Sequence, residues 1–100
     1  MDRETLLTLW ETHKLDDWPH VSTECEGPLM TLDTVICGCV VYFLDSQERL
    51  DEQRRTIIED CLSELESLEQ DLEEECRPYF QRLHELGTLL LITHRSVPES

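Results

Sequence analysis

Apolar residues recur at steps of three and four along the second half of the chain, from Leu50 to Leu90. This spacing follows one face of an α-helix and therefore predicts a long helix over residues 46–92. The stripe consists of Leu50, Ile57 or Ile58, Cys61, Leu65, Leu68, Leu72, Cys76, Tyr79, Leu83, Leu86 and Leu90. Asp45 opens the sequence DSQE, a capping box in which Glu48 can bond back to the cap amide, and this sets the predicted start.

Pro78 interrupts the stripe without changing its phase. Proline lacks a backbone N–H and clashes with the carbonyl four residues earlier, so a break or kink is predicted at 76–78. Glu73, Glu74 and Glu75 would oppose the dipole of a helix that ended at Cys76, and no glycine or asparagine lies there as a cap. Both points favour a kinked continuation, with a turn into a separate helix as the alternative.

The first half of the chain predicts two helices joined by a loop. Residues 1–14 form an amphipathic pattern that Asp2 can cap. Residues 15–30 contain Pro19, Gly27 and Pro28, which indicate a structured loop anchored by Trp18.

Residues 31–44 are ambiguous, because their β-branched and aromatic side chains favour a strand. The only other strand candidate is 88–93, and a two-stranded ribbon has marginal stability. We therefore expect 31–44 to be a helix that is apolar all round and buried, with a strand as the alternative. Residues 93–100 are expected to be a frayed tail.

These elements predict a single all-α domain, a small bundle or hairpin with one long helix kinked or turned near Pro78. An unbroken helix over 46–92 would be roughly 70 Å long, about twice the diameter of a compact domain of this size. The helix must therefore fold back or pack along a second copy. Because so short a chain buries only about two thirds of its unfolded surface, we expect a homodimer held by the apolar stripe.

The chain is strongly acidic, with 23 acidic residues, 8 basic residues and a net charge of -15. Like-charge repulsion argues against direct binding to nucleic acid or to an anionic membrane, and favours a basic protein partner. The charge is densest in a block without lysine or arginine. This acidic block comprises Glu59, Asp60, Glu64, Glu66, Glu69, Asp71, Glu73, Glu74 and Glu75.

Two interpretations of the acidic block remain open. Surface helices usually interleave charges of both signs, since a lysine four residues after a glutamate adds a few tenths of a kcal/mol. The block forgoes that stabilisation, either to keep the protein soluble or to dock a basic partner. For docking, the candidate binding residues are Glu66, Glu69, Glu73, Glu74 and Trp18.

Five cysteines are an odd number, and no signal peptide opens the sequence. We therefore expect reduced thiols in a cytoplasmic protein. The apolar run 35–44 is 10 residues long, about half of a membrane-spanning helix. We expect no transmembrane segment.

No pattern of residues indicates catalysis or a cofactor. A reactive cysteine needs a positive environment, and the best candidate, Cys76 beside Arg77, lies on the apolar stripe. A zinc site from Cys25, Cys37, Cys39 and a histidine would have an unusual CxC spacing. The prediction is a protein that is not an enzyme and has no catalytic residue, cofactor or metal.

Carboxylate pairs three residues apart do occur, at Glu66 with Glu69 and at Asp71 with Glu74, and also at Glu48 with Asp51. This spacing resembles the ExxE and ExxD motifs of the all-helical nucleoside triphosphate pyrophosphohydrolases. The resemblance implies divalent metal binding and nucleotide hydrolysis. That family places its motifs on facing helices with basic residues for the phosphates, whereas these pairs lie on one predicted helix.

The favoured function is a non-enzymatic interaction module, an adaptor, inhibitor or chaperone-like protein that binds a basic protein through its acidic helix face. One alternative is a DNA mimic, in which the carboxylates imitate a phosphate ladder and inhibit a nucleic-acid-binding protein. The other alternative is the carboxylate-metal pyrophosphohydrolase.

Overall fold

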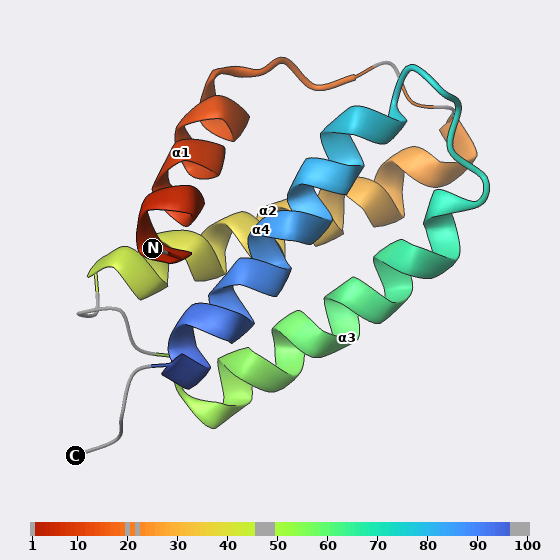
Figure 1. Ribbon diagram of the computed structural model, residues 1–100. Helices are drawn as coiled ribbons and strands as arrows, with labels where there is room; N and C mark the ends of the chain where they lie inside the picture. Colours follow the sequence, from red (N-terminus) through yellow and green to blue (C-terminus); the bar gives the residue numbers. More distant parts are fainter. Residues whose placement is uncertain (1, 20, 22, 46–49, 97–100) are drawn as a thin grey trace.

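The computed structural model describes residues 2–19, 21, 23–45 and 50–96, and these form four helices and no strand. The helices are α1 (Asp2–Leu15), α2 (Thr23–Asp45), α3 (Glu52–Glu69) and α4 (Arg77–Ser96). They pack into one bundle with a radius of gyration of 13.4 Å (Figure 1). The predicted all-α class is confirmed.

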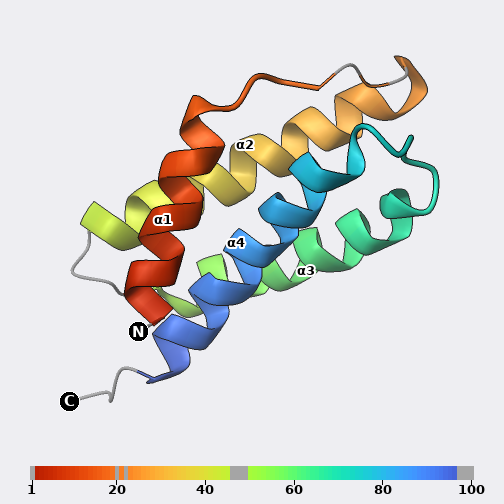
Figure 2. The ribbon, with the colours of Figure 1, turned by 45° about the horizontal axis from the view of Figure 1, so that its top comes forward.

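The last helix, α4, is the centre of the bundle and packs against each of the other three. In Figure 2 it runs between α1 and α3, with α2 behind it. Its buried side chains are Tyr79, Phe80, Leu83, Leu86, Leu90 and Thr93. The helical structure continues to Ser96, so the predicted tail is wrong for residues 93–96, and 97–100 lie outside the described residues.

The segment predicted at 31–44 is helical, and the strand alternative is wrong. The helix is also longer than predicted, because α2 begins at Thr23 and contains Pro28, so the connection from α1 is shorter than the loop expected over 15–30. Glu24 and Glu26 lie in its first turn, where the helix dipole favours negative charge.

Burial of α2 differs from the prediction. One face is in the core, through Leu29, Leu32, Ile36, Val40 and Phe43. The other face is open to solvent, where Met30 is 48% and Val41 45% exposed. The helix is therefore not buried all round, since only its inner face meets α3 and α4.

The predicted long helix over 46–92 is two antiparallel helices, α3 and α4, packed side by side (Figure 1). The kinked continuation is wrong, and the alternative of a separate helix is right. The chain turns over residues 70–76, just before Pro78, which lies in the first turn of α4 where a helix has no hydrogen bond for proline to remove. Glu73–Glu75 thus precede the positive end of α4, where the dipole favours them.

The start of α3 also differs from the prediction. Asp45 is the last residue of α2, and Glu48 of the expected capping box lies outside the described residues. The cap is Asp51, whose carboxylate accepts a hydrogen bond from the backbone N–H of Arg54 at 2.8 Å. An aspartate is among the strongest N-caps, and the helix begins after Asp51 rather than after Asp45 as predicted.

Because α3 folds back on α4, the chain buries its own apolar stripe. Leu50, Ile58, Leu65, Leu72, Cys76, Tyr79, Leu83, Leu86 and Leu90 are all in the core. Gly87 allows the two helices to approach closely, since a Cβ there would lie 2.8 Å from Cδ2 of Leu62. The stripe is therefore not available to hold a dimer.

Candidate functional site

A cluster of polar side chains joins α1, α2 and α4 around the carboxylate of Asp33. Its members, here called the Asp33 cluster, are His13, Asp16, Asp33, Cys37, Tyr79 and Arg82. Oδ1 of Asp33 lies 2.8 Å from Nε2 of His13 and accepts from the Tyr79 hydroxyl at 3.2 Å. The Cys37 thiol, one helical turn further along α2, donates to the same oxygen at 3.7 Å.

Arg82 selects the tautomer of His13. Its Nε donates to Nδ1 of His13 at 3.1 Å, and its NH2 group donates to Asp16 at 2.7 Å. A guanidinium has no acceptor, so Nδ1 carries no proton in this arrangement. The imidazole proton is therefore on Nε2, from which it is donated to Asp33.

The cluster also determines which groups keep their protons. Burial, together with the negative charge of Asp33, raises the pKa of the Cys37 thiol to about 12. The same two causes raise the pKa of Tyr79. The hydrogen bond from Arg82 is the largest of the effects that lower the pKa of Asp16.

This arrangement suits hydrogen bonding better than metal binding. The candidate ligand atoms of His13, Asp33 and Cys37 lie within 4.8 Å of one another. A metal ligand must however be deprotonated, and a coordinating histidine usually donates its other ring N–H to an acceptor. Here the thiol holds its proton, and the other ring nitrogen of His13 accepts from a cation. We assign the cluster to fastening α1 onto α2 and α4.

Nucleophilic catalysis does not fit the cluster either. A reactive cysteine needs a depressed pKa and a base that takes its proton, whereas the Cys37 thiol donates to a carboxylate that raises its pKa. The zinc site weighed for Cys25, Cys37 and Cys39 is not assembled in the described residues, where the convergent group with Cys37 is His13 and Asp33.

Cys37 should react with iodoacetamide at pH 8 about thirtyfold more slowly in the folded protein than in denaturant. Raising a thiol pKa from 9.0 to about 12 reduces the thiolate roughly a thousandfold. The higher nucleophilicity of the more basic thiolate recovers about thirtyfold of that loss. Peptide mapping after timed alkylation measures the rate, and equal rates in the two states would contradict the buried hydrogen bond.

Trp18 lies in the connection between α1 and α2 and packs inward, beside the cluster. Its ring meets Tyr79 and Phe80 edge to face, with centroids 5.6 and 5.5 Å apart. The indole N–H is buried and has no acceptor among the described residues. The residue does anchor the loop, as predicted, and its main contacts are within the chain. Tyr79 and Phe80 are both in the core.

The acidic block forms a continuous exposed surface over the second half of α3 and the turn to α4. Eight of its nine side chains are exposed and Glu69 is half-buried. The last turn of α3 contains no basic residue, although the negative end of a helix dipole favours one. A neighbouring basic side chain is His84, whose Nε2 lies 2.8 Å from Glu66.

Two hollows follow this surface. One, of about 540 Å³, is lined by Glu73, Glu74 and Glu75. The other, of about 380 Å³, lies where α3 ends and α4 begins, and its lining residues are Glu66, Glu69, Gln70, Arg77 and Gln81. Three of the four predicted binding glutamates are thus exposed. Glu73 and Glu74 line the first hollow, and Glu66 and Glu69 line the second.

The carboxylate pairs do not reproduce a pyrophosphohydrolase site. Asp71 and Glu74 lie in the turn rather than on a helix face, and Asp51 caps α3 and pairs with Arg54 at 2.7 Å. Within the described residues, the group with metal-ligand convergence is in the Asp33 cluster and includes none of these carboxylates.

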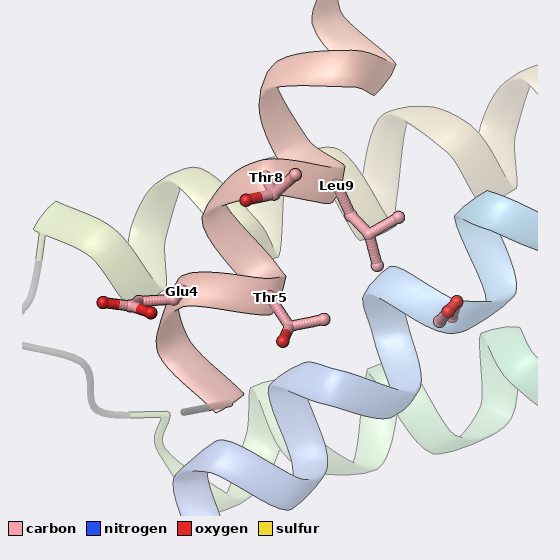
Figure 3. A pocket seen from close by; sticks show the side chains of 5 residues that line it. Glu4, Thr5, Thr8 and Leu9 are labelled. Atoms are coloured by element: carbon pink, nitrogen blue, oxygen red, sulfur yellow. The ribbon is translucent and has the colours of Figure 1, made fainter.

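A third hollow, of about 390 Å³, lies between α1 and α4 (Figure 3). Its walls are Glu4, Thr5, Thr8 and Leu9 of α1 with Glu85 of α4. It offers two carboxylates and no nucleophile beyond threonine hydroxyls. This composition indicates no reaction.

Two further features bear on the cellular setting. All five cysteines are described, and none forms a disulfide. By length and composition, Glu24–Asp45 is apolar enough to cross a membrane, although the sequence predicted no such segment from the shorter run 35–44. A core helix with one exposed face passes the same test, so this is weak evidence for a membrane span.

Comparison of the chain with protein-family models, with curated proteins and with solved structures gives no match.

Proposed function

We propose that the protein is a non-enzymatic interaction module that binds a basic protein segment through its acidic block. The observation that carries the proposal is the continuity of the block, whose exposed carboxylates run from α3 into the turn with no lysine or arginine among them. Carboxylates at the negative end of α3 lower the stability of that helix. Such a cost is typical of surfaces selected for binding rather than for stability.

The geometry supports recognition of an extended basic segment. One hollow is lined by glutamates alone, and the other combines two glutamates with Arg77, so arginine or lysine side chains of a bound peptide can meet carboxylates in both. Charge-assisted hydrogen bonds from arginine to carboxylates are the strongest contacts available there. The acidic field would also accelerate association, in a manner that salt suppresses.

Replacing Glu66, Glu69, Glu73 and Glu74 together by glutamine should weaken binding to an arginine-rich peptide by at least about tenfold at low salt. The peptide carries a fluorophore, and fluorescence anisotropy measures its affinity. A matched control replaces four exposed acids outside the block, Glu4, Glu11, Glu24 and Glu52. The control should lose no more than about threefold, because it changes the net charge equally but leaves the acidic block intact.

Equal losses in the two variants would show that binding follows net charge alone and would contradict a docking surface. Competition by duplex DNA separates the DNA-mimic alternative. A DNA mimic should compete with duplex DNA for the same groove of a DNA-binding protein, and DNA should therefore displace it.

A further inference from the structure

The outward face of α2 is uncharged over almost its whole length. Its exposed residues are Gly27, Pro28, Met30, Thr31, Thr34, Gly38 and Val41. From Gly27 to Val41 this α2 face extends about 21 Å at 1.5 Å per residue. It includes two of the large apolar side chains that the bundle leaves exposed, Met30 and Val41. In a chain with a net charge of -15, so long an uncharged face is unusual.

Packing within the bundle does not require glycine at the two glycine positions of this face. Glycine within a helix is less stable than alanine, and a Cβ at Gly27 or Gly38 would meet no atom within 4 Å. Gly87 provides an internal comparison, because its missing side chain lets α3 pack closely on α4. Gly27 and Gly38 offer the same close approach, but no helix of the described chain covers them.

The two glycines and the two threonines of the α2 face match one another when the order of residues is reversed. If two α2 helices lie antiparallel and cross between Leu32 and Asp33, residue 27 of one faces residue 38 of the other. Gly27 then faces the second copy's glycine at 38, and Thr31 faces its threonine at 34. Val41 faces the second copy's glutamate at 24, at each end of the face. Such self-complementarity is what a two-fold symmetric interface requires.

We propose that two copies of this chain associate through the α2 faces, antiparallel about a two-fold axis near the middle of the helix. Charge favours a second copy here, because two molecules of charge -15 can meet across an uncharged face without placing carboxylates opposite one another. Glu24 and Asp45 lie at the two ends of the helix, away from the axis. The proposal is independent of the proposed function, which uses α3 and the turn.

The association should be weak. One helix face is smaller than the roughly 800 Å² that each partner buries in a standard interface, so we expect a dissociation constant on the order of 100 µM. Sedimentation velocity from about 10 µM to about 1 mM should show a shift from monomer to dimer across this range. A monomer throughout would overturn the proposal.

Thr34→Asp tests the face directly. It places two carboxylates against each other near the axis and should keep the protein monomeric at every concentration. Ser63→Asp adds the same charge on the exposed face of α3 and should dimerise like the wild type. Far-UV circular dichroism confirms the fold of both variants. Dimerisation of Thr34→Asp with wild-type affinity would overturn the proposal.

Gly38→Ala tests the face with a substitution that should not destabilise the monomer. Its methyl group meets no atom of the chain, so its melting temperature at low concentration should equal or exceed that of the wild type. Its dimer should be severalfold weaker, because the methyl holds the two helices apart. A dimer as strong as that of the wild type would overturn close helix packing.

A lipid surface is the other occupant to test. If the protein floats with zwitterionic phosphatidylcholine vesicles and Thr34→Asp does not, the second copy is overturned as occupant and the face is assigned to lipid.

Discussion

Replacing Phe80 by alanine should lower the free energy of unfolding by about 4 kcal/mol. Phe80 is fully buried, and its ring packs edge to face against both Trp18 and Tyr79. The substitution removes a large apolar surface from the core and leaves a cavity where three segments of the chain meet. Urea denaturation followed by circular dichroism measures the loss as a shift of the transition midpoint.

Ile92→Ala is the matched control for Phe80→Ala. Ile92 lies on the same helix but is 45% exposed, so its truncation should cost no more than about 1 kcal/mol. A loss of less than about 2 kcal/mol for Phe80→Ala would mean that the core around α4 collapses into the cavity, contrary to the packing described.

Replacing Asp33 by alanine should lower the free energy of unfolding by about 3 kcal/mol. The change removes the acceptor for the N–H of His13 and for the hydroxyl of Tyr79, two groups that the bundle buries. It also removes one of the two carboxylates of the cluster and leaves the other, Asp16, paired with Arg82 at 2.7 Å. Thermal and urea denaturation at pH 7 measure the loss.

Asp33→Asn separates the hydrogen bonds from the charge. The amide keeps an oxygen of the same size that can accept from His13 or Tyr79, so we expect about half of the loss of the alanine variant. If Asp33→Ala costs less than about 1 kcal/mol, water replaces the carboxylate and the cluster does not fasten α1.

The apolar periodicity predicted the helices but not the point at which the chain turns. The turn at 70–76 has the length of about two helical turns, so the stripe resumes after it with nearly the same phase. Leu72 and Cys76 point into the core from the turn, as they would from a helix. Periodicity alone therefore could not distinguish a turn of this length from a continuous helix.

The extent of α2 was underestimated because Gly27 and Pro28 read as loop residues. Glu24 and Glu26, which suit a helix start, were the signal for the earlier beginning. The open face of α2 could not be predicted from hydrophobicity, since a helix that is apolar all round gives no indication of which side faces solvent.

The two candidate sites differ in how far the sequence revealed them. The acidic block is local in sequence, so its exposure could be predicted from the alternation of leucines and glutamates. The Asp33 cluster is not local, because His13 and Asp33 are 20 positions apart and His13 and Arg82 are 69 apart. Its one local signal was the spacing of Asp33 and Cys37 on the same helix face.

The pairing of α1 with α4 has a consequence for the order in which the protein folds during synthesis. Helix α1 is synthesised before the other three helices, but the helix it packs against, α4, follows both α2 and α3. The α3–α4 hairpin closes a short loop and costs little chain entropy, whereas the α1–α4 contact joins residues as far apart as His13 and Arg82, 69 positions. The ribosome therefore releases α1 without its partner, and α1 docks only after the hairpin has been completed.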